Sequence, residues 1–132
     1  MIKKIAVAAS VAALLISGTT FALKAQSGYS LHNSSASVFT TDHPNGCVGI
    51  EFPTSLAANM SPATSAIINI SSNMPSASLP CKTTYTDGAG DYCTIALTGT
   101  SSSNMTMTVE DSNYTHAGYC MVAASGTGVN FG

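Results

Sequence analysis

The four cysteines of this 132-residue chain limit its fold more than any other feature. An even number of cysteines in a short exported chain indicates a disulfide framework. No Cys-x-x-Cys pair is present to suggest a zinc or redox site. On the chain-entropy model each bridge contributes roughly 3–4 kcal/mol to stability, which is a large share of the total of about 5–15 kcal/mol typical of a small domain. The sequence therefore predicts a small domain held together by two disulfides.

Four cysteines allow three pairings. We expect Cys81 to pair with Cys93, which would close a local hairpin. Cys47 would then pair with Cys120 and tie an early strand to a late one.

The N-terminal residues have the pattern of a bacterial secretory signal. Lys3 and Lys4 supply the positive charge, an apolar run follows over residues 5–16, and Thr20-Phe21-Ala22 places small residues at a cleavage site. The run is shorter than the roughly 20 apolar residues that a membrane-spanning helix needs. We expect residues 1–22 to be cleaved, and the mature chain to lie in the periplasm, at the cell surface or outside the cell, with no later membrane span.

The mature chain would carry few charges. Removing Lys3 and Lys4 would change the formal net charge from −2 to −4, and only Lys24 and Lys82 would remain as cations because the sequence has no arginine. Phosphate contacts need several Lys and Arg side chains, so nucleic acid and anionic membranes are excluded as partners.

Residues 36–132 read as a single β-rich domain, preceded by a loose segment or edge strand over residues 23–35. Short runs with alternating apolar residues are separated by turn residues such as those of 42–46. One such run places Val48, Ile50 and Phe52 on one face. We expect a mostly β fold, a small disulfide-stapled antiparallel sandwich or barrel, with strands over residues 36–40, 47–52, 92–98, 104–110, 118–124 and 127–131.

Residues 62–73 fit two structures. Ser61-Pro62 would start a helix, and Ala63, Ala66, Ile67, Ile70 and Met74 have helical spacing. The alternation of Ala66, Ile68 and Ile70 favours a strand instead. The pattern alone leaves both alternatives open.

The most suggestive local feature is Asp87-Gly88-Ala89-Gly90-Asp91. Two aspartates across a glycine-containing loop offer oxygen ligands to calcium, but the alternating ligands and final glutamate of an EF-hand are missing. We favour a hairpin tip whose glycines supply positive φ angles. Asp87, Gly88, Gly90 and Asp91 are therefore our candidate loop for binding a partner.

The remaining reactive side chains form no catalytic motif. No Gly-x-Ser-x-Gly turn marks a nucleophile, and alternating methionines are more often core residues than copper ligands. We predict no catalytic residue, metal ligand or cofactor, and we disfavour an enzyme. The side chains considered are His32, His43 and His116, the carboxylates Asp42, Glu51, Glu110 and Asp111, and the methionines Met105, Met107 and Met121.

A hydroxyl-rich, charge-poor β-domain favours a structural or adhesive subunit at the cell surface, assembled with itself or with a protein partner. The ending Val129-Asn130-Phe131-Gly132 resembles the end of pilus subunits that assemble by donor-strand exchange, in which an added strand completes a sandwich. The resemblance covers only these residues, and four cysteines depart from the usual single bridge, so it assigns no family. The alternatives are a soluble binding module or inhibitor that presents a rigid loop, and a small secreted hydrolase.

Overall fold

The computed structural model describes residues 23–43, 47–114 and 118–132, with side chains from Tyr29 onward. The predicted signal peptide, His116 and residues 44–46 of the predicted turn lie outside the described residues. Within the described ranges, no helix has the length and apolar character needed to cross a membrane.

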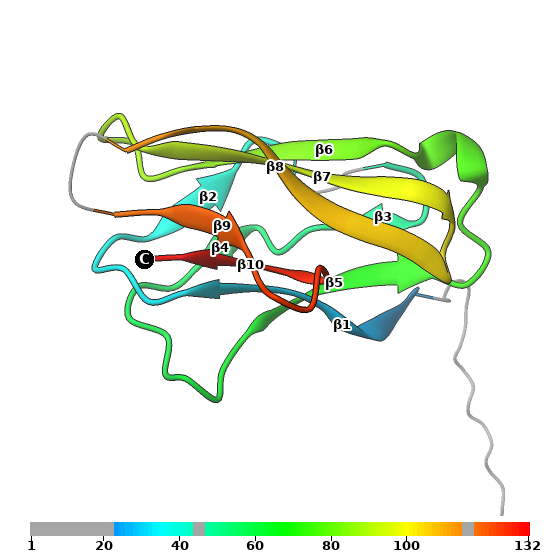
Figure 1. Cartoon of the computed structure of the whole chain (residues 1–132), viewed down its shortest axis with the longest axis horizontal. Helices are drawn as coiled ribbons and strands as arrows, with labels where there is room; N and C mark the ends of the chain where they lie inside the picture. Colours follow the sequence, from blue (N-terminus) through cyan, green and yellow to red (C-terminus); the bar gives the residue numbers. More distant parts are fainter. Residues whose placement is uncertain (1–22, 44–46, 115–117) are drawn as a thin grey trace, which may run out of the picture.

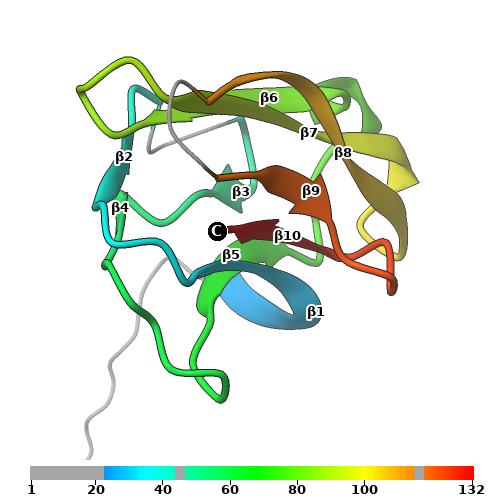
Figure 2. The ribbon, with the colours of Figure 1, turned by 60° about the vertical axis from the view of Figure 1, so that its left-hand side comes forward.

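Two five-stranded sheets pack face to face, as Figures 1 and 2 show from two directions. Sheet 1 has the order β3-β5-β1-β10-β9 and sheet 2 the order β4-β2-β6-β7-β8. The predicted mostly β, sandwich-like fold is confirmed, and the sheets do not form a closed barrel. The strands are β1 (Leu23–Asn33), β2 (Phe39–Thr41), β3 (Ile50–Glu51), β4 (Ser55–Leu56), β5 (Ala66–Ser71), β6 (Cys81–Thr86), β7 (Tyr92–Ser101), β8 (Asn104–Asn113), β9 (Cys120–Val122) and β10 (Gly128–Phe131), and a 3-10 turn, η4, spans Ser76–Ser78.

The first described strand lies in the middle of sheet 1. β1 pairs antiparallel with β5 and parallel with β10, with Ser30 opposite both Ile67 and Gly128. This differs from the loose segment or edge strand expected for residues 23–35. It also adds one parallel pair to a sandwich whose other strand pairs are antiparallel. The interior position follows from the inward-facing residues of β1, because Leu31 is fully buried between the sheets.

Alternating residues of the long strands supply much of the core. In β7 the residues Cys93, Ile95 and Leu97 are buried, and in β8 Met105 and Met107 face the same interior. This is the period-two pattern of strands with one face against a core. The reading of the two methionines as core residues is therefore confirmed.

The structure decides between the two alternatives for residues 62–73 and corrects one local prediction. Residues 62–73 contain no helix, because Ile68 and Ile70 enter the core from strand β5 and the chain before it forms turns. The strand alternative is correct. Val48 was expected on the same strand face as Ile50 and Phe52. It lies instead in a turn from Cys47 to Ile50 and is 73% exposed, whereas Ile50 and Phe52 are buried.

All four cysteines form disulfides, but the pairing that we favoured is wrong. The bridges are Cys47–Cys81 and Cys93–Cys120. In the β6–β7 hairpin Cys93 lies opposite Tyr85 and Cys81 lies opposite Leu97. This separates Cys81 from Cys93 by four residues along the strands, or about 13 Å, beyond the roughly 7 Å between Cα atoms that a disulfide spans.

Each disulfide connects the two sheets at one edge of sheet 1. Cys47 forms an isolated β-bridge with Ile50, the first residue of the edge strand β3. Its disulfide partner, Cys81, is the first residue of β6 in sheet 2. Cys120 begins the opposite edge strand, β9, and its partner Cys93 lies in β7. No disulfide includes β1, β5 or β10, so these central strands are held by hydrogen bonds and packing.

A fully buried asparagine closes β1. The Asn33 amide donates to the carbonyl oxygens of Ser37 at 2.7 Å and Ala57 at 3.0 Å, and more weakly to Leu56 at 3.4 Å. Its side-chain oxygen accepts from the backbone N–H and the hydroxyl of Ser35. The Asn33 side chain therefore supplies hydrogen-bond partners to the backbone groups of the turn through which the chain leaves sheet 1.

We expect Asn33→Ala to destabilise the protein by at least about 2 kcal/mol. A buried polar group left without a partner costs about 1–3 kcal/mol, and this substitution removes the donor to several carbonyls. Asn104→Ala is the matched control, because Asn104 is exposed and its amide donates to the Thr100 hydroxyl; its effect should stay within about 0.5 kcal/mol. Urea unfolding measures both, and equal losses would contradict the role given to Asn33.

Candidate functional site

The loop Asp87–Asp91 is the tip of the β6–β7 hairpin, as its sequence predicted. Asp87 N–H donates to the carbonyl of Asp91 at 3.1 Å. Gly88 and Gly90 have φ angles of 79° and 109°, which favour glycine. The glycines are thus explained by the turn that they form.

The Asp87 carboxylate is bound to the loop itself. Its Oδ1 atom accepts the backbone N–H groups of Ala89 at 2.8 Å and Asp91 at 3.1 Å. This geometry makes Asp87 a cap for the hairpin. Among the described residues, no group of three or more His, Cys, Asp or Glu side chains is placed to hold a metal ion.

Asp91 has a different environment from the other candidate loop residues. It is only 6% exposed, whereas Gly88 and Gly90 are exposed at the tip and Asp87 is partly exposed. Its side chain lines a pocket of about 220 Å³ at one end of the sandwich. The predicted binding loop therefore contributes one of its four residues to a concave site.

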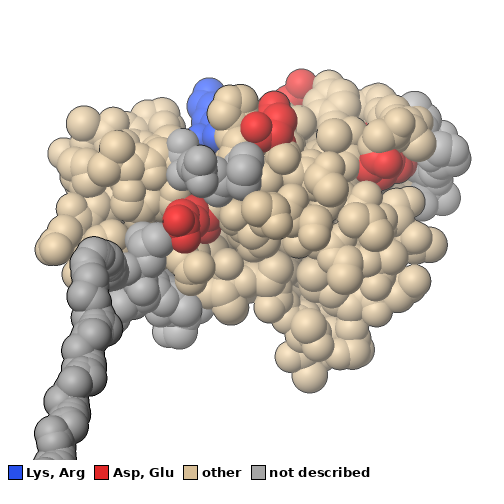
Figure 3. Space-filling model, turned by 180° about the vertical axis from the view of Figure 1, so that it is seen from behind, with Lys and Arg blue, Asp and Glu red and all other residues tan. Residues whose placement is uncertain are grey.

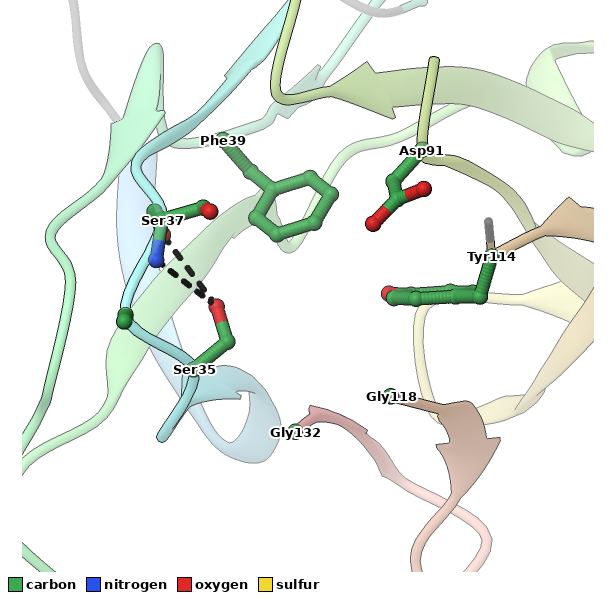
Figure 4. Close-up of a pocket in the computed structure, with 8 residues that line it drawn as sticks. Ser35, Ser37, Phe39, Asp91, Tyr114, Gly118 and Gly132 are labelled. Carbon is green, nitrogen blue, oxygen red and sulfur yellow. Dashed lines mark hydrogen bonds between the residues drawn. The ribbon is translucent and has the colours of Figure 1, made fainter. Parts of the chain in front are cut away.

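The pocket is built where several chain segments meet. Ser35–Ser37 come from the connection between β1 and β2, and Phe39 begins β2. Asp91 precedes β7 and Tyr114 follows β8, while Gly118 and Gly132 lie beside the ends of β9 and β10. In Figure 4 the Asp91 carboxylate and the Tyr114 hydroxyl point into the same space, and the Ser35 hydroxyl faces them from the other side.

Aromatic residues support this end of the sandwich. The Phe39 ring lies 5.1 Å from that of Phe131 and 6.3 Å from that of Tyr114, measured between ring centroids. Tyr85 continues the cluster with an edge contact to Phe131, and offset or edge contacts of this kind are favourable. The polar groups of the pocket therefore stand on a packed apolar base.

The Tyr114 hydroxyl is the unusual group of the pocket. Its oxygen is buried and has no hydrogen-bond partner in the described part of the chain. Burial and the negative charges of Asp91 and Asp87 raise the pKa of Tyr114 to about 12. The hydroxyl is thus neutral at physiological pH and keeps a proton to donate.

Two glycines of the pocket wall lie in close contact with their neighbours. A Cβ atom on Gly118 would lie 2.7 Å from the carbonyl oxygen of Gly132 and 2.9 Å from the Tyr114 ring. A Cβ atom on Gly132 would lie 2.3 Å from the ring of Tyr119. Neighbouring atoms therefore leave no room for a side chain at either glycine.

The other candidate side chains are spread over the molecule. His32 contacts the carbonyl of Thr64, and His43 pairs with Asp42 at the exposed surface, where their hydrogen bond lowers the pKa of Asp42. Glu51 is exposed and Met121 is 54% exposed. Asp111 accepts a hydrogen bond from the Tyr92 hydroxyl, and Glu110 pairs with Lys82. These contacts do not gather the side chains into a site.

Sequence reasoning found Asp91 but missed the rest of the pocket. Its other lining residues are small or aromatic, and they come from segments separated by tens of residues along the chain. No spacing rule connects such residues, because only the packing of the two sheets brings them together.

Comparisons of the chain with protein-family models, with curated proteins and with solved structures gave no match. The site is therefore interpreted from its own geometry.

We expect Asp87→Ala to destabilise the protein by about 1–2 kcal/mol, because two backbone N–H groups lose their acceptor. Asp87→Asn keeps an oxygen in the same place and should lose much less. Thermal unfolding compares the two variants, with Asp111→Ala as the surface control. Equal losses in both Asp87 variants, together with stabilisation of the wild type by calcium, would show a cation site instead of a capped turn.

Proposed function

We propose that the protein is an exported, non-enzymatic structural or adhesive subunit of the cell surface, and that copies assemble by exchanging their first strand. The observation that carries this proposal is the position of β1. It lies between β5 and β10, and no disulfide holds it.

The disulfides favour exchange of this strand over others. They tie the β3 and β9 edges of sheet 1 to sheet 2, so the remaining framework stays covalently connected when β1 leaves. Because the predicted signal cleavage after Ala22 would make β1 the N-terminal segment, it would withdraw without pulling another strand through the fold.

A withdrawn β1 would leave an apolar groove. Leu31 is fully buried, as are Ile68 and Ile70 of β5 and Val129 and Phe131 of β10. Exposing such side chains costs about 25 cal/mol for each Å² of apolar surface. The groove would therefore favour recapture of a strand with the same sequence, either its own or that of a second copy.

The connection from β1 to β2 suits exchange between copies. It runs through Ser34-Ser35-Ala36-Ser37, four small residues without proline, before Val38 and β2. In the closed chain Ser34 donates its backbone N–H to the Phe131 carbonyl at 2.8 Å. Extension of this segment would carry β1 to a neighbour while β2 stayed in place, as in domain swapping.

The surface and the disulfides fit a subunit of an extracellular assembly. On the face shown in Figure 3 charged side chains are few and scattered among neutral residues. Low charge reduces repulsion between copies, and it leaves few charged side chains at the strand edges to prevent pairing with another chain. Two disulfides suit an oxidising compartment such as the periplasm or the cell exterior.

The second candidate function is a soluble binding module. The pocket at Asp91 favours it, because a concave site with a few polar groups is the usual form of a small-ligand site. In this alternative the chain stays monomeric and β1 remains in its own sheet.

A third disulfide distinguishes the two functions. Ser30 and Ile67 lie opposite each other on β1 and β5, so Ser30→Cys with Ile67→Cys locks β1 to its own subunit. We expect the wild type to form multimers in light scattering. Protein whose new bridge has closed within one chain, identified by the mass of a single chain on a non-reducing denaturing gel, should stay monomeric.

The matched control places the extra disulfide elsewhere. Thr84 and Thr94 lie opposite each other on β6 and β7, with their hydroxyl oxygens 2.8 Å apart. Thr84→Cys with Thr94→Cys should assemble like the wild type. A wild type that stays monomeric at all concentrations would contradict strand exchange. So would assembly of the Ser30→Cys and Ile67→Cys variant when its new bridge is closed within each chain.

A further inference from the structure

The end of β1 contacts residues 56–60, which end β4 and form the turn after it. We call these residues the acceptor loop. The Asn33 amide donates to the Ala57 carbonyl at 3.0 Å and, more weakly, to the Leu56 carbonyl at 3.4 Å. In the closed chain these partners belong to the same copy. In an exchanged assembly, Asn33 of the incoming strand would meet the acceptor loop of the receiving copy.

Backbone contacts hold the end of β1 whatever its side chains are. Met60 N–H donates to the Asn33 carbonyl at 2.8 Å, and Asn59 N–H donates to the Ser35 carbonyl at 2.7 Å. Every residue has a backbone carbonyl, so the same bonds can form when the strand is displaced along the groove. These contacts therefore do not select a register.

Pairing with β5 also leaves the register of β1 open. The register already shifts within the strand, between Ala25 and Ser30. A displacement by one residue would turn the core-facing side chains outward, but a displacement by two keeps them on the same face. The apolar contacts that favour recapture of β1 therefore need a second determinant to place the strand.

A strand displaced by two residues would leave the acceptor loop without its donors. It would place Leu31 or Ser35 where Asn33 now lies, because every second side chain of a strand shares a face. Leucine has no donor, and serine has one on a shorter side chain, whereas the asparagine amide has two. Asn33 is fully buried, and a carbonyl that loses its donor at a buried position is costly.

A second polar contact lies four residues earlier on the same face. The Tyr29 hydroxyl donates to the Met105 carbonyl of β8 at 2.8 Å. Leu31, between Tyr29 and Asn33, is fully buried in the core. A displacement by two residues would therefore break the Tyr29 and Asn33 hydrogen bonds together.

We propose that Asn33 determines the register in which one copy receives β1 of another, by donating to the acceptor loop of the receiving copy. The Tyr29 hydroxyl supports the same register from the other side of Leu31. This inference rests on the proposed strand exchange, and it names the side chain by which a second copy of this chain is recognised as the source of the strand.

Cross-linking measures the register, because a disulfide forms only between positions that lie close together. Donor copies carry Ser30→Cys, and Ser30 lies opposite Ile67. Displacement by two residues would bring Ser30 opposite Ser65 or Asn69. We expect donors to form mixed dimers with Ile67→Cys copies at least about ten times as often as with Ser65→Cys or Asn69→Cys copies. Donors that also carry Asn33→Ala should lose most of this preference.

Two further donors control for other effects. Ser34→Ala removes a neighbouring hydroxyl that donates to the Phe131 carbonyl at 3.2 Å, and it should keep the preference for Ile67→Cys copies. Asn33→Ser keeps one donor and should show an intermediate preference. The readout is a ratio between acceptor copies, so it does not depend on how much of each donor folds.

The outcomes separate this inference from strand exchange itself. An Asn33→Ala donor that keeps the full preference for Ile67→Cys copies would overturn the role of Asn33. So would donors with Asn33 in place that link equally to all three acceptor copies. If those donors form no mixed dimer with any acceptor copy, strand exchange is wrong, and the inference falls with it.

Discussion

The fold depends on a division between covalent and non-covalent connections in sheet 1. Disulfides fix its two edges, near β3 and at β9, to the opposite sheet, while β1 in the middle is held by pairing with β5 and β10. Asn33 and the segment 34–38 then carry the chain across to sheet 2. The same segment lines the pocket through Ser35 and Ser37. The end of β1, the crossing to sheet 2 and the pocket therefore lie at one end of the sandwich, and an exchanged strand would bring the connections of two copies to that end.

The predictions that succeeded rest on local information. Alternation in β7 and β8 identified both strands and the buried faces of Ile95, Leu97, Met105 and Met107, because one buried face imposes a period of two. The hairpin tip at Asp87–Asp91 followed from its glycines, which adopt positive φ angles there. These features depend on residues that are neighbours in sequence or directly opposite across one turn.

The predictions that failed needed strand register or long-range pairing. Cys81 and Cys93 are close in sequence, yet the register of the β6–β7 hairpin, which its tip at Asp87–Asp91 sets, separates them. The position of β1 depends on a parallel partner that begins almost a hundred residues later, at Gly128. In the pocket, Tyr114 and Ser35 gave no signal because their roles arise from neighbours supplied by other segments. Such relations follow from the packing of the two sheets.

The most direct test of the central claim asks whether β1 of one copy lies beside β5 of another. Copies that carry Ser30→Cys are co-expressed and exported with copies that carry Ile67→Cys, and covalent dimers are identified on non-reducing gels. Strand exchange predicts a mixed dimer that contains one copy of each kind, because these positions are opposite in the register of β1 and β5. A mixed dimer no more abundant than that from Thr84→Cys with Thr94→Cys, a pair within one hairpin, would show that β1 stays in its own subunit.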